Sequence, residues 1–273
     1  MQQLPIRTIL SLLSLLLWSS PSLASSCPGS RLQNDGVIFG ITVCSHRSMP
    51  RTLVKHVAVI TAEYLDNDEN GKADNPAVVN ALSRNRATLL ILPDEEHLEH
   101  LEEHMERLAE RTGREPQMQP VLLDDIHPGG AARGEFDATL EEVLHLITQA
   151  GYAYAYPTLF GERPGTAIAK AMDRARGGYF ATVPSRYPRN AWYSYDDRTC
   201  EYNCMISEYF YWALTSLLNG QNFPGRQEEI AHEWRANTPE KLRRIDPDVT
   251  RLLTNPRYAL PSRLPDGHYR PWQ

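Results

Sequence analysis

Residues 137–150 read DATLEEVLHLITQA, and this stretch decides how the rest of the chain is interpreted. One side of it carries the apolar residues Leu140, Val143, Leu144 and Ile147. Their spacing of i, i+3, i+4 and i+7 is typical of one face of a helix with about 3.6 residues per turn. We therefore predict a helix whose apolar face covers a hydrophobic core.

The polar face of the same helix carries Glu141, Glu142 and His145. Glu141 and His145 are spaced i, i+4, and Glu142 and His145 are spaced i, i+3, so both pairs lie on one face. Two carboxylates and an imidazole in that arrangement can hold a divalent metal ion or move a proton. They can also simply face water.

A second informative helix is predicted within residues 202–218, where positions 205–218 are apolar or weakly polar on nearly every face. This pattern is typical of a helix that is buried all round. Glu208 is the only formally charged side chain in residues 205–218. Because a buried carboxylate is costly unless it is paired, protonated or bound to a metal, we predict Glu208 as a ligand or catalytic group. The alternative is a Glu208 held by an arginine or by tyrosine hydroxyls.

Together these two helices resemble the zincin metallopeptidases that use a glutamate as the third metal ligand. The His-Glu-x-x-His motif of that family overlays Glu141-Glu142-x-x-His145, with its first histidine replaced by Glu141. The resemblance implies that Glu141, His145 and Glu208 are metal ligands and that Glu142 is the general base. Zinc is the metal expected first, although two carboxylates and one imidazole suit manganese or iron at least as well. An oxyanion could be stabilised by one of four side chains, Tyr195, His127, His268 or Tyr269.

Three functions compete on this basis. The resemblance implies an exported metal-dependent hydrolase, in its most specific form a zincin-like peptidase acting on peptides or proteins, or a degenerate relative. The alternative is a non-catalytic secreted domain, stabilised by calcium and disulfide bonds, with a binding or structural role. A redox metal protein is the third, because Glu142-x-x-His145 also has the spacing used in di-iron helical bundles. That architecture needs a second Glu-x-x-His on a partner helix, and no such partner is predicted.

The acidic run from Asp66 to Asp74, DNDENGKAD, resembles the calcium loop of EF-hand and dockerin-type modules. A helix is predicted to enter it, and Gly71 makes the sharp turn at loop position 6. The resemblance implies five calcium ligands: Asp66, Asp68, Asn70, the carbonyl of Lys72 and Asp74. Position 12, which normally supplies a bidentate glutamate, is Ala77, so weak affinity is expected. An Asx- and Gly-rich connector between two helices is the alternative interpretation.

Residues 1–24 have the layout of a signal peptide. Arg7 precedes an apolar run at residues 9–18, and Ser22 and Ala24 occupy the −3 and −1 positions of a cleavage site. We expect cleavage after Ala24, which leaves residues 25–273 as a single exported domain, secreted or periplasmic. No later segment is apolar for the roughly 20 residues that a membrane span requires.

The charge of the exported part argues against a nucleic-acid partner, because binding to phosphates needs a basic surface. The full chain has a formal net charge of −6, and removing residues 1–24 takes away Arg7 and no acid, which gives −7.

All four cysteines lie in the exported part, and an even number in an oxidising compartment indicates disulfides. Of the three connectivities, Cys27–Cys44 with Cys200–Cys204 is the simplest. A thiolate metal site at Cys200-x-x-x-Cys204 is the alternative.

The order of elements predicts an α+β fold, helix-rich, with a small sheet near Val37, Leu89 and Val121. A zincin-like arrangement is compatible with it, since strands precede the motif helix and helices follow it. Strands are predicted at 36–44, 87–92 and 117–123. Helices are predicted at 51–65, 77–82, 94–111, 137–150, 166–176 and 205–218.

Overall fold

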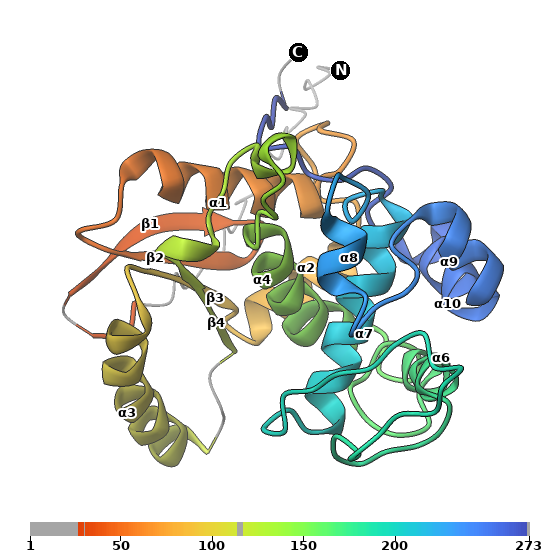
Figure 1. Cartoon of the computed structure of the whole chain (residues 1–273). Coiled ribbons are helices and arrows are strands. Elements are labelled where there is room, and N and C mark those ends of the chain that lie inside the picture. The colour runs from red at the N-terminus through yellow and green to blue at the C-terminus, as the bar shows by residue number, and fades with distance from the viewer. Residues whose placement is uncertain (1–26, 30, 114–116, 272–273) are drawn as a thin grey trace, which may run out of the picture.

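The α+β fold predicted from the sequence is present in the computed structural model: many helices surround one small sheet (Figure 1). The structure describes residues 27–29, 31–113 and 117–271. The predicted signal peptide, residues 1–24, lies outside these described residues. The strands are β1 Leu32–Ile38, β2 Ile41–His46, β3 Thr88–Leu92 and β4 Met118–Leu122.

The sheet is mixed and its spatial order is β1-β2-β3-β4. β1 pairs with β2 antiparallel, whereas β2–β3 and β3–β4 are parallel pairs. Parallel neighbours need long crossover connections, and the helices between the strands supply them. The three segments predicted to form the sheet, near Val37, Leu89 and Val121, all take part in it.

The strand predicted over residues 36–44 is in fact a hairpin, so that prediction is wrong in detail. The chain turns at Phe39 and Gly40, whose φ angles are 42° and 88°. Two successive residues with positive φ make the two-residue turn that joins antiparallel strands. Asparagine or aspartate is usual at the first of these positions, so Phe39 hid the turn inside an apolar run.

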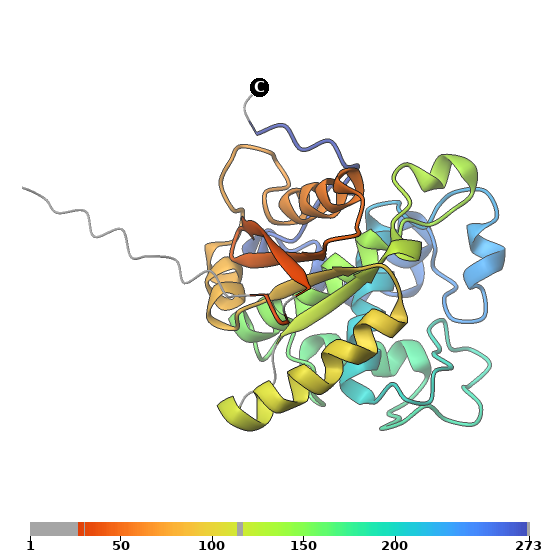
Figure 2. The same cartoon turned by 90° about the vertical axis from the view of Figure 1, so that its left-hand side faces the viewer.

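Both faces of the sheet are covered, which is why every residue of β3 is buried. Leu89 and Ile91 belong to the main core, whereas Leu90 and Leu92 belong to a smaller cluster that packs against α3. Alternate residues of a strand point to opposite faces. Figures 1 and 2 accordingly show α1 and α3 on opposite sides of the sheet.

The helices that surround the sheet match most of the predicted ranges. They are α1 Arg51–Leu65, α2 Pro76–Arg84, α3 Glu95–Thr112, α4 Thr139–Leu146, α5 Ala153–Ala155, α6 Ala167–Arg176, α7 Tyr202–Leu217, α8 Arg226–Ile230, α9 Pro239–Ile245 and α10 Pro247–Leu253. Short 3₁₀ turns occur at η1 Leu123–Asp125, η2 Gly130–Arg133 and η4 Pro256–Tyr258.

The helix predicted at 137–150 consists of α4 and a π-helical continuation, η3 Ile147–Tyr152. The predicted end of this helix at residue 150 is wrong, because η3 runs on through Gly151 to Tyr152. A Cβ atom at position 151 would lie 2.8 Å from Cγ1 of Val78. Gly151 therefore allows η3 to approach α2 more closely than any other residue would.

Helix α4 lies between the sheet and α7, and it packs against both (Figure 1). The predicted burial of α7 on all sides is confirmed, since Tyr209, Tyr211 and Trp212 are all at least 95 % buried. Neighbouring helices α6, α9 and α10 cover the side of α7 away from the sheet. The polar face of α4 is thus directed toward the one charged residue in the interior of α7.

Both predicted disulfides are present, Cys27–Cys44 and Cys200–Cys204, with Cα–Cα distances of 5.7 and 5.4 Å. No free cysteine remains among the described residues, so the thiolate metal site at Cys200 and Cys204 is not formed. Of the helices that the structure describes, none combines the length and the apolar character needed to cross a membrane.

Candidate metal centre

Contact between α4 and α7 brings Glu141, His145 and Glu208 together. One ligand atom from each lies within 4.8 Å of the others, a spacing that allows all three to contact one metal ion. Nε2 of His145 lies 3.6 Å from Oε2 of Glu208. The three residues that the sequence predicted as metal ligands are therefore neighbours, although Glu208 is more than 60 positions from the other two.

His145 is the buried member of the group, with 6 % of its surface exposed. Its Nε2 atom has no hydrogen-bond partner among the described residues. A buried polar atom without a partner is unfavourable and calls for an explanation. A metal ion between Nε2 and the two carboxylates would satisfy it, and carboxylate and imidazole ligands suit zinc, manganese or iron.

The alternative of an arginine partner for Glu208 is not realised among the described residues, where its ion-pair contact is with His145. A hydrogen bond with Tyr195 does hold it, so part of the tyrosine alternative applies. Burial raises the pKa of Glu208 to about 8, and the negative charge of Glu233 adds to the shift.

Burial raises the pKa of Glu141 well above its ordinary value, and the nearby Glu208 adds to the effect. A hydrogen bond joins the two carboxyl groups. Two adjacent buried carboxylates cannot both ionise easily, so in the absence of a cation the pair holds at least one proton at neutral pH. Burial also lowers the pKa of His145, which keeps the imidazole neutral, as a metal ligand must be.

Glu142 occupies the other side of the His145 ring. Its Oε2 atom lies 3.9 Å from Nδ1 of His145, and it accepts a 2.6 Å hydrogen bond from Nε2 of Gln119 on β4. Burial raises the pKa of Glu142 to about 7. Carboxylates placed behind a metal-binding histidine commonly fix its tautomer and its orientation. The role of Glu142 as general base stays a prediction.

A hydrogen-bond chain that the sequence did not reveal supports Glu141. The Arg226 guanidinium donates to the Tyr211 hydroxyl at 3.3 Å, and that hydroxyl is hydrogen-bonded to Glu141. Arg226 also lies over the ring of Phe136, 4.2 Å from its centroid. Arg226 is on the short helix α8, 85 residues after Glu141 in the chain, and no spacing pattern connects the two.

A cleft of about 560 Å³ opens beside Glu141. His127, for which the sequence allowed either a turn or a role in the site, lies in a turn and lines this cleft. The other charged or titratable residues that line it are Asp124, Glu135, Arg226, Glu229, His232 and Glu233. The candidate metal centre is therefore open to small molecules on the Glu141 side.

Glu233 was missed in the sequence because it sits in a turn after α8. Its pKa is raised, first by burial, and it lies in a group with Asp196 and His232 whose ligand atoms are within 4.8 Å of one another. A second Glu-x-x-His also occurs at Glu229 and His232, which the prediction of no partner motif overlooked. Helix α8 ends at Ile230, however, and Glu229 pairs with Arg226 at 2.8 Å, so the two residues do not present one helical face.

The predicted calcium loop connects α1 to α2. Ligand atoms of Asp66, Asp68 and Asp74 lie within 4.8 Å of one another. Asp66 accepts hydrogen bonds from the backbone N–H groups of Asn70 and Gly71, at 3.0 and 2.8 Å. These bonds fold the loop around Asp66.

Two further loop residues have defined places. The backbone N–H of Lys72 donates to the side-chain oxygen of Asn70 at 2.9 Å. Ala77, at loop position 12, is exposed near the start of α2 and offers no side-chain oxygen.

The C-terminal segment at residues 262–270 packs on this loop. The hydroxyl of Tyr269 donates to Asp66 at 2.5 Å, and the N–H of His268 donates to Glu63 at 2.9 Å. Asn67 is held by the backbone of Arg263. Tyr269 and His268 therefore contact the acidic loop and the end of α1, whereas Tyr195 and His127 lie at the α4–α7 site or its cleft.

Comparison with protein-family models, curated proteins and solved structures finds no match for this chain. Its function is therefore inferred from the side chains that α4 and α7 bring together.

Proposed function

We propose that this protein is an exported metal-dependent hydrolase, in its most specific form a zincin-like peptidase or a relative that has exchanged the first histidine for Glu141. The ligands of the ion are Glu141, His145 and Glu208. The observation that carries the proposal is the buried Nε2 atom of His145, which has no hydrogen-bond partner in the described part of the chain and lies 3.6 Å from Glu208. The adjoining cleft gives a substrate access to Glu141.

A divalent ion at this site would supply Lewis acidity toward water and toward a substrate carbonyl. The protein's part is to hold the ligands in the required protonation state. The His145 tautomer with its proton on Nδ1, directed at Glu142, leaves the lone pair of Nε2 facing Glu208. Any proton that Glu141 and Glu208 hold has to leave when a cation binds.

Two carboxylates compete for the role of general base. Glu142 is the base that the resemblance implies, and Glu233 is a carboxylate that lines the cleft outside the ligand group. A raised pKa, as each of them has, suits a group that takes and returns a proton near neutral pH. Single replacements by glutamine, compared at saturating metal, separate the two candidates, because loss of the base lowers the turnover of the metal-loaded protein.

The test is metal content, measured by elemental mass spectrometry on the wild type and on the double variant His145→Ala with Glu208→Ala. We expect close to one equivalent of zinc, manganese or iron in the wild type and its loss in the variant. Glu162→Gln is the matched control. Glu162 is another largely buried acid near α7; it accepts a hydrogen bond from the Ser207 hydroxyl and lies outside the ligand group. The proposal would be refuted if the wild type held no zinc, manganese or iron even after reconstitution with each of these ions.

The second function, a non-catalytic domain stabilised by calcium, is favoured by the packing of residues 262–270 on the acidic loop. In that proposal Ca²⁺ binds at Asp66, Asp68, Asn70, the Lys72 carbonyl and Asp74. Its test is the change of melting temperature with added Ca²⁺. A calcium-dependent increase together with a protein free of transition metal would favour this function over the hydrolase.

A further inference from the structure

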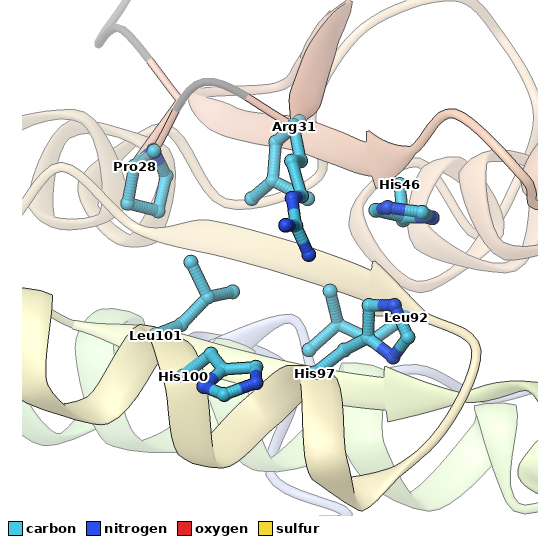
Figure 3. Close-up of a pocket in the computed structure, with 9 residues that line it drawn as sticks. Pro28, Arg31, His46, Leu92, His97, His100 and Leu101 are labelled. Carbon is cyan, nitrogen blue, oxygen red and sulfur yellow. The ribbon is translucent and has the colours of Figure 1, made fainter.

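A separate pocket of about 290 Å³ lies on the face of the sheet that α3 covers (Figure 3). Three parts of the chain enclose it: the segment leading into β1, the ends of β2 and β3, and the first turns of α3. The side chains that matter here are Arg31, His46, Leu92, His97, His100 and Leu101. Helix α4 packs on the opposite face, so this pocket is distinct from the candidate metal centre.

The polar side chains of the pocket are all cationic or able to become so. Figure 3 shows Arg31 reaching from the upper wall toward the space between His46, His97 and His100. The rings of His46 and His97 meet edge to face with centroids 4.7 Å apart. The residues that line the pocket include no carboxylate.

The nearest acids pair with two of these histidines from outside the pocket. Asp94 accepts hydrogen bonds from the N–H of residue 97 and from its imidazole, at 3.1 and 2.6 Å, and so caps α3. Glu96 lies 4.0 Å from His100 on the exposed side of the helix. Arg31 has no ion-pair partner among the described residues. The guanidinium of Arg31 is therefore the fixed positive charge of the pocket, and it has no acidic partner in the described part of the chain.

The remaining wall of the pocket is apolar. Leu92 belongs to the small core between the sheet and α3, and Leu101 packs against that core from the helix. Burial lowers the pKa of His46, and the nearby His97 and Arg31 lower it further. One end of the cavity is thus hydrophobic. The other holds the fixed charge of Arg31 beside the imidazole rings, and a bound anion would favour the protonated form of His46.

The wall that carries Arg31 is held in place covalently. The Cys27–Cys44 disulfide ties the segment before β1 to the middle of β2. This tether keeps Arg31 opposite α3, so a ligand would enter a site that is largely formed in advance.

We propose that this pocket binds a small organic anion, with a carboxylate or phosphate group against Arg31, His46 and His97 and a short apolar chain against Leu92 and Leu101. Arg31 supplies the fixed positive charge, and its planar guanidinium suits two oxygen atoms of one anionic group. The volume of about 290 Å³ lies just below the usual range for ligand sites, which starts at about 300 Å³, and this limits the apolar part to a short chain.

The test uses sodium hexanoate and hexyl phosphate as probes, followed by calorimetry and by the NMR signals of the histidine imidazoles. We expect saturable binding of at least one probe, with shifts of the His46, His97 and His100 signals. Hexan-1-ol has the same chain without the charge, and it is expected to bind at least about tenfold more weakly. Binding of one probe alone identifies which anionic group the site prefers.

The matched variants are Arg31→Gln and Arg51→Gln, both at exposed arginines. The melting temperature of each is measured as well, because the side chain of Asp35 that Arg51 contacts is largely buried. Arg51 pairs with Asp35 away from the residues that line the pocket. Arg31→Gln is expected to weaken binding by about tenfold or more, and Arg51→Gln is expected to leave it unchanged. Equal binding of hexan-1-ol and the anions, wild-type affinity in Arg31→Gln, or no saturation by either anion would overturn the proposal.

Discussion

Replacing Glu208 with glutamine is expected to stabilise the metal-free protein at alkaline pH while removing its metal site. Burial raises the pKa of this carboxyl from 4.5 to about 8 in the folded protein. Between those two values the folded state holds a proton that the unfolded chain has released. The free energy of unfolding of the metal-free wild type therefore falls as the pH rises from about 4.5 to about 8, because the folded state binds more protons there.

The size of this change in the free energy of unfolding follows from the shift in the pKa of Glu208. One pKa unit corresponds to about 1.4 kcal/mol, so a shift of this size amounts to about 5 kcal/mol at most. The Glu208 side chain is 12 % exposed, so solvent screening reduces this figure only moderately. The neutral amide of Glu208→Gln has no such cost. Near pH 8 the variant is expected to melt roughly 10 °C above the metal-free wild type, and near pH 5 the two are expected to agree.

The assay is thermal and urea denaturation of chelator-treated protein at several pH values, followed by addition of zinc or manganese. Metal is expected to restore stability at pH 8 in the wild type and to have no effect on Glu208→Gln. Glu162→Gln is the control, since burial raises the pKa of Glu162 to about 7 as well, but this residue is outside the ligand group. It is expected to flatten the pH profile partly and to keep the response to metal. A wild-type profile that is flat between pH 5 and 8, or a Glu208→Gln variant that is less stable at pH 8, would refute the reasoning.

Four other changes test the remaining parts of the account. Glu142→Gln is expected to weaken metal binding by about tenfold or more through loss of the support of His145, as equilibrium dialysis would detect. Glu233→Gln is expected to keep the metal, and if Glu233 is the base its kcat for a cleaved peptide falls by about a hundredfold or more. Asp68→Ala is expected to abolish the increase of melting temperature with Ca²⁺, which an unchanged calcium response would contradict. Gly151→Ala is expected to cost about 1–3 kcal/mol in the free energy of unfolding, since its methyl group meets Val78, and denaturant titration measures this.

Periodicity in the sequence was enough to place most of the elements. The apolar stripe of 137–150 predicted α4, and the nearly continuous apolar surface around Glu208 predicted the buried helix α7. Each of these signals is local, because a helix must match its side-chain spacing to its own surroundings. The hairpin at Phe39 was missed because the turn depends on positive φ angles, and an apolar residue gives no sign of them in the sequence.

The sequence could predict those residues of the site that lie on the long helices α4 and α7. Glu141 and His145 share a face by their spacing, and Glu208 stands out as a charge in an apolar run. Arg226 and Glu233 carry no such signal, because they lie in or after the short helix α8 and reach the cleft only through tertiary packing. An arginine or glutamate in a charged, exposed-looking segment is indistinguishable from a surface residue until the fold brings it near a buried carboxylate.

The packing of residues 262–270 on the acidic loop also bears on the order of events during folding. Asp66 and Tyr269 are 203 residues apart in the chain, and Glu63 and His268 are 205 residues apart. Closing so long a loop is entropically slow, so residues 262–270 reach the acidic loop only after the intervening helices have formed. Until then the carboxylates of the loop repel one another without the tail to cover them. A cation that neutralises them would hasten the last stage of folding, and refolding of this protein is expected to proceed faster in calcium-rich surroundings than in calcium-free ones.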